Sequence, residues 1–265
     1  ASILKKLEER KIQREDVAGI GMGIPAPVDS KGVVQQTANV GWGYKEVTRE
    51  LSELLDGMRV EAGNDANVAA MGEMWMGAGR GEKNLVMVTL GTGVGGGVIV
   101  DGHMIVGHHG AGGEIGHIHV RDDEWEHCNC GGVGCLEQIA SATGIAREAR
   151  RKMAADSRDS MLRKFGDDVT AKDVLDAAKA GDELADEVFE VVARYLGLAL
   201  GQAALIVDPE IFVIGGGVSR AGQFLVDRVF KYYDYFTPIS KFKAKIGLAT
   251  LGNDAGIYGA ARLIL

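Results

Sequence analysis

Cysteine and proline are both scarce in this sequence. Of its 265 residues, 3 are cysteine and 4 are proline. All three cysteines fall between Cys128 and Cys135, so we expect no disulfide elsewhere, and this usage favours a reducing compartment, the cytoplasm. Low proline together with 39 glycines indicates close backbone approaches within a folded chain rather than disorder.

Long basic runs and long apolar runs are also missing. The formal net charge is −8 at pH 7 and no basic cluster stands out, so we expect no nucleic-acid partner. We expect no apolar stretch of transmembrane length and no signal peptide, and therefore no membrane partner. With 46% hydrophobic residues, the chain is long enough to bury a substantial core in one large domain or two.

Short apolar stretches alternate with stretches of helical periodicity along the chain. The predicted strands cover residues 17–24, 58–62, 85–90, 98–100, 211–214 and 244–248. The predicted helices cover residues 44–55, 64–76, 136–153, 157–164, 171–179, 183–206, 219–235 and 254–265. Strands that alternate with helices predict an α/β fold with a largely parallel sheet.

The region before and around the cysteines carries the strongest chemical pattern. Three thiolates and one imidazole form a closed tetrahedral set for zinc, and this clustering favours a metal site over unrelated buried cysteines. The three cysteines are Cys128, Cys130 and Cys135. The fourth ligand is open among the neighbouring histidines His117, His119 and His127.

Two glycine-rich motifs suit a ligand that carries phosphate. Leu90 to Gly97 joins two predicted strands, and such a turn can present backbone N–H groups and the Thr92 hydroxyl to phosphates. A plain glycine-rich hairpin is the alternative. Ile214 to Ser219 lies at the carboxyl end of a predicted strand, where three glycines let adenine or ribose approach the backbone. The alternative there is a turn in which Ser219 caps the next helix.

Three carboxylates and an amide complete the candidate set. Asp65 follows a predicted strand and begins a helix, so it is either an N-cap or a general base that accepts a proton from a sugar hydroxyl. Asn64 can donate to and accept from hydroxyls. Glu114 and Glu137 flank the cysteine loop, and Glu137 also suits the first turn of its helix. A metal-fixed loop that carries two such carboxylates suits a polyol.

Together these motifs resemble the ROK family of repressors, open reading frames and sugar kinases. The resemblance runs from Ile20 to the C-terminal helix, and its most specific part is the zinc signature that ends at Glu137. The other matching motifs are Gly63-Asn-Asp-Ala-Asn67, Leu90-Gly-Thr-Gly-Val-Gly-Gly-Gly97, Ile214-Gly-Gly-Gly-Val-Ser219 and Gly252-Asn-Asp-Ala-Gly256. Within the family, residues 111–117 and 136–144 most resemble those of bacterial glucokinases.

The resemblance implies an actin-like ATPase fold of the ribonuclease-H type, with two lobes and a cleft. The small lobe would comprise residues 1–64 and 254–265, and the large lobe residues 65–253. The implied activity is ATP-dependent phosphorylation of a hexose at its 6-hydroxyl, as in a glucokinase, with Mg²⁺ and a structural Zn²⁺. The implied partners are the hexose and ATP, and a homodimer or higher homo-oligomer is common in the family.

The resemblance also implies a role for each candidate residue. Asp65 would be the catalytic base. His117 would bind zinc through one ring nitrogen and face a sugar hydroxyl with the other, which favours it over His119 and His127. The implied sugar-binding residues are Asn39, Asn64, Asp65, Glu114, His117 and Glu137. The implied nucleotide-binding residues are Gly91, Thr92, Gly93, Gly95, Gly215, Gly216 and Gly217. The implied zinc ligands are His117, Cys128, Cys130 and Cys135.

One motif of the family is not found in the sequence. The first phosphate motif, Asp-x-Gly-Gly-Thr on an N-terminal hairpin, does not occur. We therefore expect an incomplete N-terminal lobe, and no kinase activity unless the missing segment is supplied. Two other functions stay open: a sugar-sensing repressor of the same family with a DNA-binding segment outside this sequence, and a sugar-binding module without catalysis. Asp65 and the two glycine motifs favour the kinase.

Overall fold

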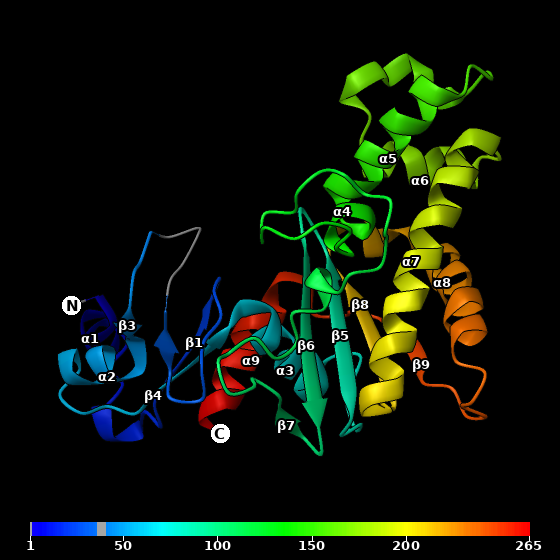
Figure 1. Ribbon diagram of the computed structural model, residues 1–265. Coiled ribbons are helices and arrows are strands. Elements are labelled where there is room, and N and C mark those ends of the chain that lie inside the picture. Colours follow the sequence, from blue (N-terminus) through cyan, green and yellow to red (C-terminus); the bar gives the residue numbers. More distant parts are fainter. Residues whose placement is uncertain (1, 36–40) are drawn as a thin grey trace.

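The fold is built on a five-stranded sheet with the order β7-β6-β5-β8-β9 (Figure 1). The computed structural model describes residues 2–35 and 41–265. β8 and β9 run parallel to β5, whereas β6 is antiparallel to β5 and β7 to β6. The predicted α/β fold is confirmed, but one edge of its sheet is antiparallel. The strands are β5 (Leu85–Leu90), β6 (Val94–Val100), β7 (His103–Met104), β8 (Ile211–Gly215) and β9 (Lys245–Leu248).

Alternate residues of the central strand face two different helical layers. Val86 and Val88 belong to the core under α7 and α8, whereas Leu85 and Met87 pack with Met71 of α3 on the opposite face. Successive side chains of a strand point to opposite faces, so a strand that is apolar at every position is covered on both sides. The covering helices are α3 (Asp65–Met76), α7 (Glu183–Val207) and α8 (Gln223–Phe236).

A smaller sheet lies on the far side of α3 (Figure 1). Its strands β1 (Ile20–Ile24) and β4 (Val60–Asn64) are parallel, and α9 (Ala255–Ile264) packs against them and against α3. β2 (Val33–Val34) and β3 (Lys45–Glu46) form a separate antiparallel pair. These two strands and β7 were not predicted, because two residues are too few to show a periodicity. The helices beside the smaller sheet are α1 (Ser2–Glu9) and α2 (Val47–Leu54).

α3 and α9 cross at two glycines. A Cβ atom on Gly259 would lie 1.7 Å from the carbonyl oxygen of Val68, and one on Gly72 would lie 2.0 Å from that of Ala255. No real Cβ atom fits at such distances, so the crossing requires glycine on both helices. The two sheets are joined through this close contact.

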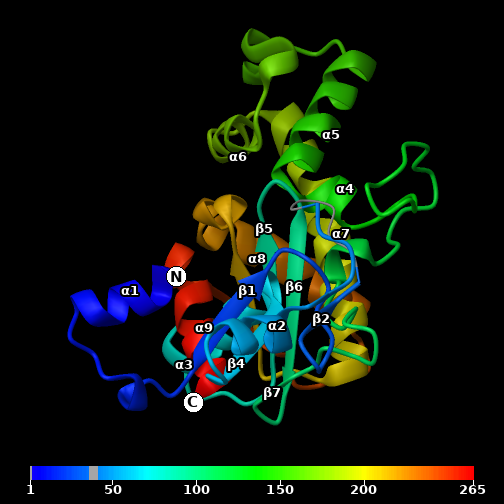
Figure 2. The ribbon, with the colours of Figure 1, turned by 90° about the vertical axis from the view of Figure 1, so that its left-hand side faces the viewer.

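The helix predicted over residues 136–153 is two helices, α4 (Glu137–Ala140) and α5 (Ala142–Ala155). Ser141 separates them because its backbone is extended, and its hydroxyl oxygen accepts from the Gly144 N–H at 3.0 Å and so caps α5. The next elements, which rise away from the sheets in Figure 2, are the 3-10 helix η3 (Met161–Asp168), in place of a helix predicted over 157–164, and α6 (Ala171–Lys179), as predicted.

The predicted glycine turn is shorter than expected. β6 already begins at Val94, so Gly95 to Gly97 lie within a strand instead of a turn. Gly95 and Gly97 are needed there because α3 packs very closely against β6. A Cβ atom on Gly97 would lie 2.6 Å from the Cβ atom of Ala70.

The prediction that Ser219 caps a helix is wrong. Ser219 lies within η4 (Gly217–Ala221), and its hydroxyl donates to the carbonyl oxygen of Gly216 at 2.7 Å. α8 begins only after Gly222, so no side-chain oxygen caps it. The remaining 3-10 helices are η1 (Arg14–Asp16), η2 (Ile115–His117) and η5 (Gly252–Asp254).

The expectation that the chain has no apolar stretch of transmembrane length is wrong for α7. Within residues 2–35 and 41–265, it is the one helix long and apolar enough to cross a membrane by length and composition. Half of its apolar window is buried inside the protein, and Val192, Leu196 and Leu200 are fully buried against the sheet core. A long core helix meets the same criteria of length and composition as a membrane span.

Candidate functional site

A cleft of about 670 Å³ lies where β1 and β5 end, next to the start of α3. The structure brings most of the predicted site residues together there, from segments far apart in the sequence. Asn39 lies outside the described residues. The predicted residues that line the cleft are Asn64, Asp65, Gly91, Thr92, Gly93, Gly95, Glu114, His117, Glu137 and Gly216.

The cleft also has walls that sequence reasoning missed. The stretch from Pro25 to Pro27 lines it directly after β1. Its signal in the sequence was a pair of prolines at the end of a strand, which marks a fixed backbone but not a ligand site. The other lining residues are Ala66, Ala69, Thr89, Val94 and Gly96.

Asn64 and Asp65 have different tasks at the start of α3. Asn64 is the N-cap: its Oδ1 accepts from the N–H groups of Ala66 (3.0 Å) and Asn67 (3.2 Å), and its Nδ2 donates to the Ala26 carbonyl oxygen (3.3 Å). The interpretation of Asp65 as the N-cap is therefore wrong, although its Oδ1 accepts from the Ala66 N–H at 2.8 Å. Asp65 is exposed to the cleft, whereas Asn64 keeps one free N–H.

The turn between β5 and β6, residues 91–93, is fixed by hydrogen bonds to α4 and α5. The Val94 N–H donates to Oε2 of Glu137 at 2.9 Å. The Ala142 N–H and the Thr143 hydroxyl donate to two carbonyl oxygens of the turn, each at 2.8 Å. Two of these bonds engage carbonyl oxygens of the turn. The Gly91 N–H donates within the turn to the Gly93 carbonyl oxygen at 3.0 Å, so the N–H groups of Thr92 and Gly93 are the ones that can meet an anion.

Glu114 directly precedes η2 and His117 is its last residue, and both line the cleft. Oε2 of Glu114 lies 4.0 Å from Nε2 of His117, and both side chains are about 34% exposed. Burial raises the pKa of the Glu114 carboxyl; His117 opposes this shift, and the carboxylates of Asp65 and Glu137 add to it. The cleft therefore gathers three carboxylates whose charges repel one another until hydroxyl groups or cations enter.

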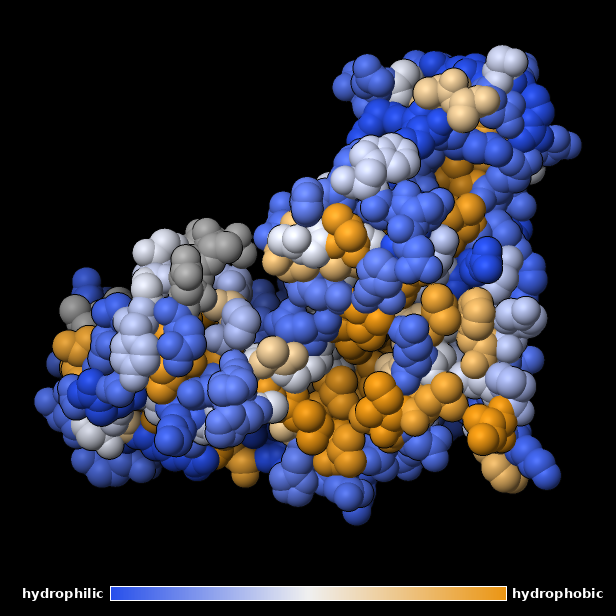
Figure 3. Space-filling model, viewed as in Figure 1, coloured by the Kyte–Doolittle hydropathy of each residue, from blue (hydrophilic) through white to orange (hydrophobic). Residues whose placement is uncertain are grey.

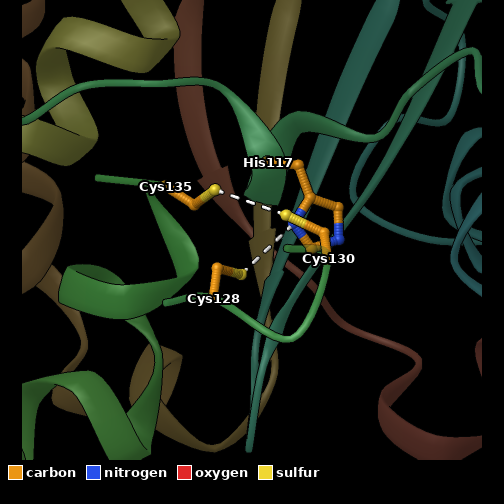
Figure 4. Close-up of side chains that lie close together, drawn as sticks. All are labelled: His117, Cys128, Cys130 and Cys135. Atoms are coloured by element: carbon orange, nitrogen blue, oxygen red, sulfur yellow. Dashed lines mark hydrogen bonds between the residues drawn. The ribbon is translucent and has the colours of Figure 1, made fainter. Parts of the chain in front are cut away.

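Four side chains point toward one another beside the cleft (Figure 4). Sγ of Cys130 lies 3.7 Å from Sγ of Cys135, and Nδ1 of His117 lies 3.7 Å from Sγ of Cys128. All four ligand atoms lie within 4.8 Å of one another. Ligand atoms of a tetrahedral zinc site are about 3.8 Å apart, so the two distances of 3.7 Å match such a site and the donor set fits zinc.

The two other candidate histidines lie outside this cluster. His119 has one ring nitrogen 2.7 Å from the Val133 carbonyl oxygen and the other 2.9 Å from Asp122. His127 has Nδ1 3.3 Å from the Gly131 carbonyl oxygen. Both rings therefore stabilise the loop around the cluster instead of joining it.

A buried carboxylate anchors the loop that leads to the cysteines. Glu124, whose side chain is fully buried, accepts from Arg147 at 2.8 Å and twice from Arg151 at 2.9 Å. These bonds, those of Arg151 first, lower the pKa of Glu124 to about 2. Arg147 also donates to the carbonyl oxygen of Gln138 at 2.7 Å, so the loop, α4 and α5 are tied together.

The second glycine motif is divided between two cavities. Gly216 lines the main cleft, Gly217 lines a neighbouring cavity of about 380 Å³, and Gly215 lines neither. The residues opposite Gly217 share no pattern in the sequence, because they come from the start of α5, from α6 and from η4 and meet only in the folded chain. They are Ala142, Thr170, Ala171, Lys172, Leu175, Asp176, Lys179, Val218, Arg220 and Ala221.

Comparison with known proteins gives one consistent result. The ROK family model matches residues 2–265. The chain is 41% identical over 264 residues to a glucokinase of Halalkalibacterium halodurans. The aligned residues cover 98% of this chain and 80% of that protein. It is 39% identical over 255 residues to a glucokinase of Thermotoga maritima, with 94% and 80% covered.

The solved structures agree with the sequence relatives. A ROK family glucokinase from Streptomyces griseus in complex with glucose and AMPPNP is similar at a TM-score of 0.78, with 33% identity and 99% and 86% of the two chains covered. The fold is therefore the actin-like ATPase fold that the resemblance implied. With its cysteine cluster, its glycine motifs and these relatives, the chain belongs to the ROK family.

Proposed function

We propose that this protein is an ATP-dependent hexose kinase that phosphorylates glucose at the 6-hydroxyl. One observation carries the proposal: Asp65 shares a cleft with the glycine turn 91–93. The carboxylate of Asp65 is available there because Asn64, not Asp65, is the N-cap of α3. Phosphoryl transfer needs a group that accepts the hydroxyl proton and donors that hold the phosphates, both facing one space. The similarity to bacterial glucokinases supports glucose as the sugar and ATP as the donor.

Asp65 serves as the general base in this proposal. Its carboxylate accepts the 6-hydroxyl proton while the sugar oxygen forms a bond to the γ-phosphorus of ATP, and the bond from that phosphorus to the leaving ADP oxygen breaks. The N–H groups of Thr92 and Gly93 and the Thr92 hydroxyl hold the phosphates. Mg²⁺ bound with ATP neutralises phosphate charge during the transfer.

The other polar groups of the cleft hold the sugar. Glu114 and Glu137 accept from hydroxyl groups, His117 offers Nε2, and Asn64 offers its remaining N–H. Sugar hydroxyls can donate to carboxylates and accept from N–H groups, so this set suits a polyol. Asn39 completes the predicted set.

The nucleoside half of ATP lies in the cavity beside Gly217. Gly216 lines the main cleft, where the phosphates bind, and Gly217 lines the neighbouring cavity. The glycine motif therefore connects the two spaces. Leu175, Val218 and Ala221 offer apolar walls to a flat base, and Lys179 offers a charge to the ribose or phosphate end. The role of Gly215 is to end β8 in a buried position.

His117, Cys128, Cys130 and Cys135 would hold a structural zinc ion, which would keep the loop in one conformation. The chain itself links this loop to the sugar residues. Glu137, two residues after Cys135, accepts at 2.9 Å from the N–H of Val94, which directly follows the phosphate turn. His117 belongs to both the cluster and the cleft.

A cytoplasmic homodimer completes the proposal. All three cysteines are free and lie in the metal cluster, which suits a reducing compartment. Figure 3 shows apolar residues gathered on the face that carries β6, β7 and the end of α7, and Ile206 there is 81% exposed. A large exposed apolar area on one face supports association with a second copy.

The Asp65→Asn variant of the natural protein tests the activity. We expect kcat for ATP-dependent glucose phosphorylation to fall about 10³-fold, because an amide cannot accept the proton, while glucose affinity stays within about tenfold. Asp167→Asn, which changes an exposed carboxylate in η3, is the matched control and should keep full activity. Turnover of Asp65→Asn near the wild-type rate would show that Asp65 is not the base.

A further inference from the structure

Asn67 lies at a junction of three segments that build the cleft. It is in the first turn of α3, two residues after Asp65, and it is only 2% exposed. Its side chain meets the segment Gly112–Gly113, which leads directly into Glu114. One buried amide therefore connects the helix that begins at Asp65 with the loop that carries Glu114.

Glycines bring the three segments unusually close at this point. A Cβ atom on Gly113 would lie 2.9 Å from Oδ1 of Asn67, and one on Gly97 of β6 would lie 3.1 Å from the Asn67 Cα atom. A Cβ atom on Gly96 would lie 2.4 Å from the Gly113 carbonyl oxygen. There is no room for a larger side chain, so a shift of Asn67 displaces the loop.

The hydrogen bonds of Asn67 fix how its amide is oriented. Nδ2 donates to the carbonyl oxygen of Gly112 at 3.3 Å, and because a carbonyl can only accept, the amide oxygen must face the other way. That oxygen, Oδ1, is buried and has no hydrogen-bond donor among the described residues. A buried acceptor without a donor is unfavourable and is rare in native proteins.

Two backbone donors beside it are also unpaired. In the part of the chain that the structure describes, neither the Gly113 N–H nor the Glu114 N–H has an acceptor, whereas the Gly112 N–H donates to Val106 and the Ile115 N–H to Gly113. Gly113 has a φ of +88°, a conformation open to glycine, so the peptide that follows it can turn at little cost. An unpaired acceptor on α3 and two unpaired donors on the loop beside it thus lie close together.

We propose that Asn67 is the positioning residue that sets where Glu114 lies relative to Asp65, and that its Oδ1 accepts the Gly113 or Glu114 N–H when the sugar is bound. Sugar binding then closes a hydrogen bond that the free protein lacks. Asn67 does not touch the sugar and acts through Glu114. The inference rests on the proposed function, in which Glu114 accepts from a sugar hydroxyl.

A double-mutant cycle tests the coupling. We expect Asn67→Ala to raise the KM for glucose about tenfold with kcat changed less than about threefold, and to add less than about twofold in an Asn67→Ala/Glu114→Gln double variant. Asn67→Asp keeps the side-chain volume but loses the N–H that donates to Gly112. If the alanine variant does not fold, the KM for glucose is measured in Asn67→Asp instead, and we expect it to be raised. Effects of Asn67 and Glu114 that multiply independently would overturn the inference.

Asn84→Ala is the matched control. Asn84 also accepts a backbone N–H, that of Asp101 at 2.9 Å, but it lies at the opposite end of β5 from the cleft. It should change thermal stability without changing the KM for glucose. If Glu114→Gln alone leaves the KM unchanged, the sugar role of Glu114 is wrong, and hydrogen exchange then decides the inference.

Hydrogen–deuterium exchange of residues 112–117 gives a readout that does not depend on activity. Glucose is expected to slow exchange of the Gly113 or Glu114 amide in the wild-type protein and to leave it unchanged in Asn67→Ala, because the acceptor is gone. Equal protection in both proteins, or none in the wild type, would refute the proposed bond.

Discussion

Glu114 shares its cleft with two other carboxylates and is itself only about 34% exposed. Burial is the main reason that its pKa is raised above 4.5, and Asp65 and Glu137 add to the shift. A carboxyl group with a raised pKa takes up a proton at a higher pH than a glutamate in water. Its ability to accept from a sugar hydroxyl is therefore lost earlier as the pH falls.

This sign predicts how sugar affinity depends on pH. The KM for glucose should rise as the pH falls through the Glu114 pKa, by on the order of tenfold per pH unit below it. Glu114→Gln removes the titrating group, so its KM should be higher at neutral pH and nearly flat over the same range. Measured KM values against pH in both proteins check this. A wild-type KM that stays constant down to pH 4.5 would contradict the role of Glu114.

At the scale of single residues, the sequence identified most of the cleft but not how its members divide their tasks. The sequence pattern favours Asp65 as a possible N-cap, yet the N-cap is Asn64, because the backbone angles of the folded chain decide between the two residues. The motif of residues 63–67 predicts no role for Asn67, because its partners Gly112 and Gly113 come close only in the folded chain.

At the scale of elements, the loop with the cysteines joins the metal cluster to the sugar site. Purified protein should contain about one zinc per chain by elemental analysis. Cys130→Ser should lose the zinc and raise the KM for glucose about tenfold, since the loop orients Glu137 and His117. Asn129→Ser, a neighbouring exposed change, should keep both properties. Full sugar affinity in the Cys130→Ser protein would show that the loop does not orient the sugar-binding residues.

Elements with strong local patterns were predicted well. β5 and α6 match their predicted ranges, because each is long enough to show its periodicity. Residues 95–97 were expected to form a turn, yet they belong to β6, because close packing of α3 decides their conformation. Tertiary packing therefore overrides the local preference of glycine for a turn at these residues, which lie next to the cleft.

At the scale of the whole molecule, the crossing of α3 and α9 holds the two sheets together. Gly259→Ala should lower the free energy of unfolding by about 3 kcal/mol, because its Cβ atom would overlap the Val68 carbonyl oxygen. Gly256→Ala, in the same helix with nothing within 4 Å, should raise it by about 0.5 kcal/mol. Denaturant unfolding of both variants checks this, and equal effects would contradict a tight crossing.

The whole fold was predicted through family resemblance rather than through local pattern. Helix and strand alternation gives an α/β class, but it does not say that α9 leaves the five-stranded sheet to pack on β1 and β4. The motifs around the cysteines supplied that topology, since they are specific to one family. The lobe boundaries at residues 64/65 and 253/254 stay a prediction.

The position of α9 has a consequence for how the chain is synthesised. β1 and β4 leave the ribosome early, whereas the helix that covers them is made only after the whole five-stranded sheet, and a Cβ atom on Gly21 of β1 would lie 1.8 Å from the carbonyl oxygen of Ala260. Until α9 emerges, the face of the early sheet that Gly21 presents to Ala260 lacks its covering helix. The N-terminal layer is therefore completed late, by a long-range contact that forms only after the five-stranded sheet has been synthesised.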